Sequence, residues 1–169
     1  SEMCIRDRAR LDKLMSIQGK HGAEYFHRQL GEILYRDCGV ARNKEDLARG
    51  IEEIRELRKA FWSDLFIPGE PNEMNQQLEY ANRVADYIDL GELMCVDALD
   101  RDESCGAHYR DDHISEDGEA ERDDANWCFV SAWERGNNGP AWDLSGHEFI
   151  RHAEPLTFEA VPLMTRNYK

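Results

Sequence analysis

Cysteine and histidine side chains gather around one acidic stretch of the sequence, and they are the residues there best suited to bind a metal ion. Cys105, His108, His113 and Cys128 offer the ligand types that zinc prefers. Their spacing begins C-x-x-H-x-x-x-x-H, which does not match a compact zinc knuckle. A zinc site is therefore an alternative to the simpler interpretation that these are polar residues of a loop.

The same stretch can be compared with a calcium loop and with a cysteine nucleophile. If Gly118 is the central glycine of an EF-hand, the first ligand becomes His113 and the last becomes Asp124. An EF-hand needs a carboxylate first and a bidentate glutamate last, so the match fails at both ends.

Cys105 with His108 could form a nucleophile pair, but nothing in the sequence indicates an oxyanion hole. We therefore expect no catalytic, cofactor-binding or metal-binding residue in this chain.

The distribution of charge excludes some classes of partner. The 169 residues have a formal net charge of −14, and eleven acidic residues but three arginines lie between Asp100 and Asp124. Nucleic acids and anionic membrane surfaces attract clusters of lysine and arginine, so we expect neither as a partner.

No run of about 18 apolar residues occurs, so no direct membrane span is predicted. The five cysteines show no C-x-x-C spacing and are expected to be reduced thiols.

Three amphipathic helices are predicted before the acidic stretch. The first lies within 21–40 and ends at Gly39, and the second begins at the N-cap residue Asn43. The third covers about 72–99, with Gly91 as an interruption, and a shorter helix over 10–17 leads into the first. Apolar residues at helical spacing predict the core positions Phe26, Leu30, Ile33, Leu34, Cys38, Leu47, Ile51, Ile54, Leu57, Phe61, Leu65, Leu78, Ala81, Val84, Ala85, Ile88, Met94 and Val96.

The expected fold class is mainly α: an antiparallel three-helix bundle, similar to a spectrin repeat, followed by an irregular tail with short β-strands. The bundle would occupy 9–100 and the tail 101–169. NWCFVSAWE at 126–134 alternates, with Trp127, Phe129, Ser131 and Trp133 on one side, and PLTFEAVPLM at 155–164 is a second strand candidate. A loop segment this long is uncommon in a compact domain, so we expect the tail to lie on a surface outside this chain and to be loosely held without it.

One ordered set of motifs resembles a known family. VADYIDLGELMCVDALDRDESCGAHYRDDH at 84–113 is followed by AERDDANW at 120–127 and by a terminal TRNYK. The set resembles the C-terminal region of the flavoprotein subunit of succinate dehydrogenase/fumarate reductase, where a helical bundle ends in a segment like ELxxxDALxRxESxGAHxRxD and an RDDxNW stretch follows. The resemblance covers about 10–169. Its matching residues are Glu103, Ser104, Gly106, His108, Arg110, Arg122, Asp123, Asp124 and Trp127.

The residue types of this motif suit a tight turn that docks the tail. Gly106 can adopt a positive φ or allow a close backbone approach, and Glu103 and Ser104 can accept hydrogen bonds from neighbouring amides. Direct contact of the motif with flavin or substrate is the alternative. Many family members have arginine where this chain has Cys105, so any ion pair made by that arginine is absent here.

The resemblance also implies an activity for a larger parent protein. The family exchanges a hydride between a dicarboxylate and FAD, and it passes electrons to an iron–sulfur subunit held by a membrane cytochrome b anchor. Such a complex would be cytoplasmic and peripheral on the inner face of the bacterial plasma membrane. The family's FAD fold and its catalytic histidines and arginines lie N-terminal to the region that matches. We therefore expect this chain alone to bind no FAD and to be inactive.

Two other functions are possible for the chain, and its first eight residues need separate treatment. L-aspartate oxidase has the same architecture and a similar Ser-x-Gly-x-His segment, and a free-standing acidic helical interaction module is a third possibility. Residues 1–8, SEMCIRDR, resemble a translated sequencing adapter and are excluded from fold reasoning. Under that interpretation the chain is an N-terminally truncated fragment of the parent.

Overall fold

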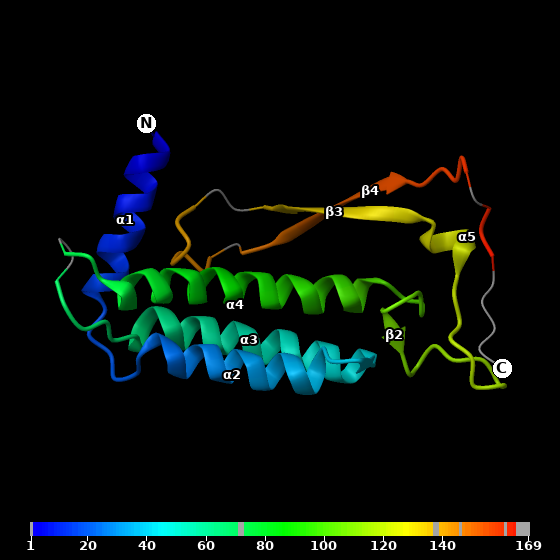
Figure 1. Ribbon diagram of the computed structural model, residues 1–169, viewed down its shortest axis with the longest axis horizontal. Helices are drawn as coiled ribbons and strands as arrows, with labels where there is room; N and C mark the ends of the chain where they lie inside the picture. The colour runs from blue at the N-terminus through cyan, green and yellow to red at the C-terminus, as the bar shows by residue number, and fades with distance from the viewer. Residues whose placement is uncertain (1, 71–72, 137–138, 146, 161, 165–169) are drawn as a thin grey trace.

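The computed structural model describes residues 2–70, 73–136, 139–145, 147–160 and 162–164. Three long helices lie side by side, and a two-stranded hairpin runs along one of them (Figure 1). The expected mainly α fold with a short-stranded tail is confirmed. The helices are α1 (Glu2–Ser16), α2 (Ala23–Asp37), α3 (Lys44–Asp64), α4 (Gln76–Asp100) and α5 (Asp124–Trp127), and the strands are β1 (Ala41–Arg42), β2 (Tyr109–Arg110), β3 (Phe129–Arg135) and β4 (Phe149–Pro155).

The ends of the bundle helices follow from local hydrogen bonding. Asn43 is the N-cap of α3 as expected, and its side-chain oxygen accepts a hydrogen bond from the Asp46 amide at 2.9 Å. Gly39 follows the end of α2, where a Cβ would lie 2.7 Å from the Tyr35 carbonyl oxygen. Asn75 caps α4 by accepting from two amides, so α4 begins at Gln76 rather than near residue 72.

Helix α4 continues through Gly91, so the interruption expected there is absent. A Cβ on this residue would lie 3.0 Å from Leu30 Cδ1 and 3.3 Å from Leu34 Cδ1. The missing side chain therefore allows α4 to pack closely against α2.

The buried residues form one apolar core between α2, α3 and α4, with Leu14 of α1 closing one end. All expected core positions are buried or partly buried except Met94, whose exposed fraction is 46%. The prediction for Met94 was wrong because the buried face of α4 continues from Ile88 through Gly91 and Glu92 to Cys95, which leaves Met94 on the outer face.

The lead-in helix α1 is longer than expected, because it begins at Glu2 rather than near residue 10. Residues 3–9 are exposed, and Leu14 is the first buried position along this helix.

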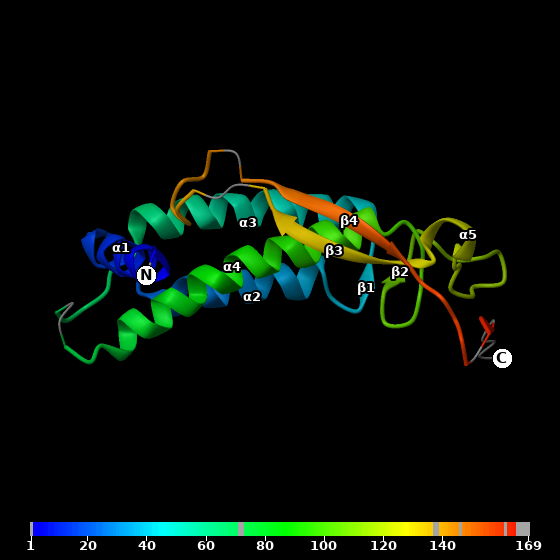
Figure 2. The same cartoon turned by 90° about the horizontal axis from the view of Figure 1, so that it is seen from above.

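The strands form two small sheets: β2 of the tail pairs with β1 of the bundle, and β3 pairs with β4 (Figure 2). β3 lies where a strand was expected, although Trp127 belongs to α5. β4 pairs with β3 in antiparallel register from Phe149 opposite Arg135 to Pro155 opposite Phe129. The strand expected at 155–164 was therefore wrong in its described part, because the partner of β3 is the preceding segment. The Leu156 amide still donates to the Cys128 carbonyl at 3.3 Å, but residues 156–160 are exposed and lie outside any strand.

Candidate functional site

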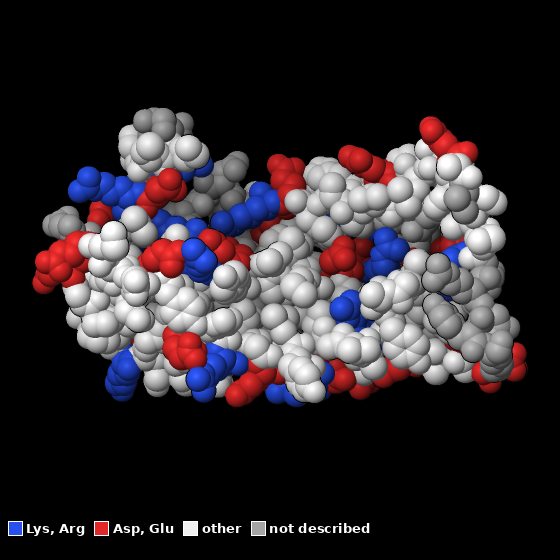
Figure 3. All heavy atoms as spheres, viewed as in Figure 1, with Lys and Arg blue, Asp and Glu red and all other residues white. Residues whose placement is uncertain are grey.

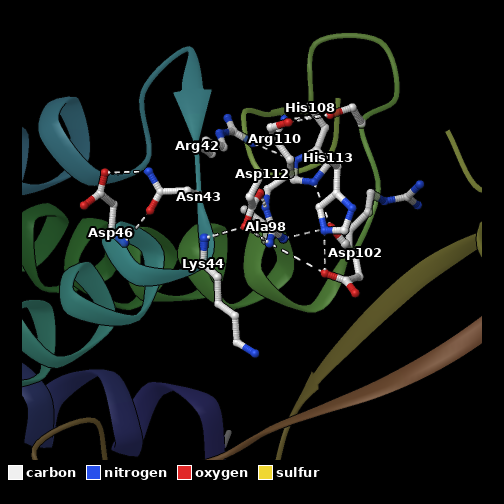
Figure 4. Close-up of polar contacts among 12 residues, drawn as sticks. Arg42, Asn43, Lys44, Asp46, Ala98, Asp102, His108, Arg110, Asp112 and His113 are labelled. Atoms are coloured by element: carbon white, nitrogen blue, oxygen red, sulfur yellow. Dashed lines mark hydrogen bonds and ion pairs between the residues drawn. The ribbon is translucent and has the colours of Figure 1, made fainter. Parts of the chain in front are cut away.

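Arg110 is the buried centre of the family motif, with an exposed fraction of 1% (Figure 4). Its Nε and Nη2 atoms donate to the two carboxylate oxygens of Asp112 at 2.7 and 2.8 Å. Its Nη1 atom donates to the carbonyl oxygens of Ala98 at 3.4 Å and Arg101 at 3.3 Å. The guanidinium therefore satisfies carbonyls that the end of α4 leaves without helical partners.

Asp112 extends this contact to the start of α3. One of its carboxylate oxygens accepts from the Lys44 amide at 3.0 Å, and the neighbouring Asp111 amide donates to the Arg42 carbonyl at 2.8 Å. β1 and β2 pair in parallel beside these contacts. Hydrogen bonds from Arg110 lower the pKa of Asp112 to about 2, so the carboxylate is charged at neutral pH.

Gly106 forms the turn that returns the chain to the bundle. Its φ is +62°, and no described residue other than glycine has a positive φ. Cys105 and His108 exchange backbone hydrogen bonds at 2.8 and 3.1 Å across this turn, as in a type II′ hairpin. The Ser104 hydroxyl accepts from the Arg110 amide at 2.8 Å and donates to the Arg110 carbonyl at 3.0 Å. The expected tight turn is thus present at these residues.

His108 has partners at both ring nitrogens. Nε2 lies 3.0 Å from the Arg101 carbonyl oxygen, and Nδ1 lies 3.1 Å from Arg42 Nη1. These partners require the neutral tautomer that carries its proton on Nε2. Burial lowers the pKa of His108, and the positive charge of Arg42 adds to this effect. His108 is therefore a neutral hydrogen-bonding residue at pH 7.

The second half of the motif is joined to the first through Glu103, which is 2% exposed. One carboxylate oxygen accepts from Arg101 Nη1 at 2.7 Å, and the other accepts from the Asp123 amide at 2.8 Å. Asp123 in turn caps α5 by accepting from the Asn126 amide at 3.2 Å. Two motifs that lie about twenty residues apart in the sequence are therefore in contact at Glu103.

Arg122 and Asp124 form an ion pair of their own at 2.6 Å. The Arg122 Nη1 atom also donates to the Met164 carbonyl at 3.3 Å, which links α5 to the last described residues. The terminal TRNYK motif at 165–169 lies outside the described residues.

Trp127 connects the motif to the hairpin. Its ring lies 5.8 Å from the Arg101 guanidinium and 5.6 Å from that of Arg151. Polar contacts attach the two strands to α4, since Arg151 pairs with Asp100 at 2.7 Å and the Trp133 indole donates to Asp97 at 2.7 Å.

These contacts tie the motif to the end of α4 and the start of α3. The groups that could react are paired with one another, and within the described parts of the chain no three His, Cys, Asp or Glu side chains are arranged to hold a metal ion. Sequence reasoning missed Asp112 and Arg42. Asp112 lies in the turn that follows β2, and its signal was the final aspartate of the motif ELxxxDALxRxESxGAHxRxD. No sequence signal pointed to Arg42.

We expect the substitution Arg110→Lys to lower the free energy of unfolding of this chain by about 3 kcal/mol, because lysine cannot contact both Asp112 oxygens and the α4 carbonyls at once. Urea denaturation measures the change. Arg122→Lys is the matched control, since the Arg122–Asp124 ion pair is more exposed than Arg110, and it should change stability much less. Equal effects of the two variants would contradict the assignment.

The Arg110–Asp112 pair should also make stability depend on pH. Because the pKa of Asp112 is lowered to about 2 in the folded chain, its contribution is fully present above the unfolded value of about 4 and is lost as the pH falls through about 2. The stability difference between the wild type and Asp112→Asn should therefore shrink from about pH 5 to pH 2. Asp111→Asn, at an exposed neighbour, is the control, and a pH-independent difference for Asp112→Asn would argue against the pair.

Comparison with known proteins identifies relatives that match most of this chain. The family model described as "Fumarate reductase flavoprotein C-term" matches residues 27–168. The fumarate reductase flavoprotein subunit of Proteus vulgaris is 32% identical over 117 residues, which are 69% of this chain and 19% of that protein. The succinate dehydrogenase flavoprotein subunit of Bacillus subtilis is 28% identical over 114 residues, which are 68% of this chain and 18% of that protein.

A solved structure of the Escherichia coli quinol fumarate reductase has the same fold, with a TM-score of 0.78 and 22% identity over 95% of this chain and 25% of that one. The chain therefore spans about a fifth of the length of the relatives that it matches. The helical bundle, the turn centred on Arg110 and these matches together show that the chain belongs to the fumarate reductase flavoprotein C-terminal family.

Proposed function

We propose that this chain is the C-terminal helical domain of an FAD-containing subunit that interconverts succinate and fumarate. The family match over residues 27–168 is the observation that carries the proposal. The relatives bear the names of fumarate reductase and succinate dehydrogenase flavoprotein subunits. The parent would transfer a hydride between the dicarboxylate and FAD and pass electrons to an iron–sulfur subunit.

The buried polar residues of the motif do not themselves fit a flavin. The buried polar groups of the motif, Arg110, His108 and Glu103, already have partners within the chain, so none is left to hold a phosphate or a flavin ring. FAD and the catalytic residues would lie in the part of the parent that precedes this chain. No reaction step is therefore assigned to any residue here.

The role of the motif would be to hold the tail in position against the flavin-binding part. Residues after β4 are exposed as far as the structure describes them, and Leu156 and Phe158 have exposed fractions of 43% and 48%. The outer face of the hairpin exposes Val130 and Ile150 as well. The same face carries Glu154 opposite Val130 and Glu134 opposite Ile150, and Figure 3 shows acidic side chains among uncharged surface on this side of the molecule. Exposed apolar side chains beside a few charged ones support docking to another protein surface.

The parent would act in a complex with an iron–sulfur subunit and a membrane cytochrome b anchor. It would lie on the inner face of the bacterial plasma membrane and face the cytoplasm. The solved relatives support a complex, since they include a quinol fumarate reductase. None of the described helices of this chain is long and apolar enough to cross a membrane.

Expression of the complete gene that contains residues 9–169 tests the activity. We expect the complete subunit to retain FAD and to turn over succinate or fumarate at least about 100-fold faster than aspartate. The present chain, purified alone, should retain no flavin after gel filtration with added FAD. A preference for aspartate would identify an aspartate oxidase, and a complete gene product without flavin would favour a free-standing interaction module; either outcome contradicts the proposal.

The substitutions Val130→Lys and Ile150→Lys, made together, test the docking of the hairpin. Because both side chains point to the exposed face and lie opposite Glu154 and Glu134, the pair should leave the thermal midpoint of the isolated chain nearly unchanged. In the complete subunit the same pair should lower the midpoint and the FAD content, since charges would be buried. Ile114→Lys, at an exposed residue of the acidic loop, is the control. No effect in the complete subunit would contradict docking through this face.

A further inference from the structure

The segment between β3 and β4 lies across the bundle and buries a histidine there. Its described residues, 139–145 and 147, are called the strap from here on. Figure 1 shows the strap at the end of the hairpin that lies farther from α5. The Trp142 ring lies 6.1 Å from that of Trp62 on α3, and Ala141 and Leu144 also pack against the apolar core. The side chain of His147, at the end of the strap, is 8% exposed.

The charged groups around His147 come from α3, α4 and β3. The Nε2 atom of His147 lies 3.3 Å from a carboxylate oxygen of Glu92 on α4, a residue with an exposed fraction of 1%. Arg58 of α3 lies 2.5 Å from the same oxygen, and Arg55 lies 2.8 Å from the other one. The Glu92 carboxylate is therefore already paired with two guanidinium groups while His147 is neutral.

A second carboxylate and a third guanidinium lie next to this pair. Arg58 donates to Asp89 of α4 at 2.9 Å, and Arg135 of β3 lies 3.9 Å from the other Asp89 oxygen. Together with Arg55, three guanidinium groups and two carboxylates surround the imidazole, so the group carries one net positive charge. The other neighbours are two rim residues of opposite charge and an uncharged ring of β4, which are Glu52, Lys59 and Phe149.

Protonation of His147 would add a second net positive charge to this buried group. Neither ring nitrogen makes a hydrogen bond with a described residue, although the Glu92 oxygen is near. Burial lowers the pKa of His147, and the positive charge of Arg58 lowers it further, whereas Glu92 opposes this shift. At neutral pH the strap therefore packs over an uncharged imidazole.

We propose that the strap opens reversibly at mildly acidic pH, with protonation of His147 as the trigger. In the open strap His147 is solvated and titrates near its ordinary value of about 6.5. Because its pKa is lower in the closed strap, the closed state has its full stability above about pH 6.5 and loses it as the pH falls further. One proton can raise the equilibrium constant for opening about 10-fold between pH 7.5 and pH 5.5.

The change should remain within the strap and the neighbouring ends of β3 and β4. Glu92 keeps its pairs with Arg55 and Arg58 when the strap opens, because all three side chains belong to the bundle. Opening would uncover Trp62, which is 8% exposed in the closed form. Mild acidity would thus expose an apolar part of α3 without unfolding the bundle.

Amide hydrogen exchange of the purified 169-residue chain at about pH 5.5, 6.5 and 7.5 tests the proposal. The reporters are the Gly136 and Asp143 amides, which donate to the Glu148 and Pro140 carbonyls at 2.8 and 2.9 Å in the closed form. Their protection factors, which correct for the intrinsic effect of pH on exchange, should fall by up to about 10-fold from the highest to the lowest pH. The core amides of α3 and α4 should keep their protection factors.

His147→Gln is the test variant, because glutamine takes up no proton in this range. Its protection factors at the two reporters should not change with pH, whatever their absolute values are. His152→Gln is the matched control, since the His152 side chain is 55% exposed and pairs with Glu134, and it should show the wild-type fall. Constant protection in the wild type, a fall that persists in His147→Gln, or an equal loss in the core of α3 and α4 would each overturn the proposal.

Discussion

The burial of one positive charge, the Arg110 guanidinium, constrains the end of the bundle where α4 ends and the tail begins. A charge removed from water is tolerated only when its hydrogen bonds are satisfied. Arg110 meets this requirement with the Asp112 carboxylate and with two carbonyls at the end of α4. Because Asp112 also accepts from the first turn of α3, the contact joins the end of one bundle helix to the start of another. The tail leaves the bundle from this fixed point.

The two parts of the chain are held by different forces. The bundle buries a continuous apolar core, and the segment that joins β3 to β4 packs Ala141, Trp142 and Leu144 against it, whereas the strands are tied to α4 by polar contacts such as Arg151–Asp100. Solvated polar contacts contribute less to stability than apolar burial does, so local opening should be easier in β3 and β4 than in the bundle. The segment that we expect to be loosely held is therefore shorter than the whole tail, because residues 110–112 are hydrogen bonded to the bundle.

Much of the bundle could be predicted from the sequence because helical periodicity and capping are local. The Asn43 cap and the buried faces of α2 and α3 follow directly from residue type and spacing. Met94 could not be placed, because its burial depends on how α4 turns against α2 near Gly91. The position of β4 also failed, because strand pairing is decided by non-local register, and the exposed face of β4 gave little alternation. The Arg110–Asp112–Lys44 contact joins residues 68 positions apart, a separation that no local pattern reports.

Amide hydrogen exchange of the isolated chain tests the central claim most directly. If the Arg110 contact fixes the tail to the bundle, four amides should exchange nearly as slowly as the core amides of α3 and α4. They are the amides of Lys44, Ser104, Arg110 and Asp111, which donate to Asp112, Glu121, Ser104 and Arg42. Amides from residue 157 to 160 should exchange as fast as an exposed loop. Rapid exchange at Arg110 and Asp111 while α3 and α4 remain protected would contradict the account.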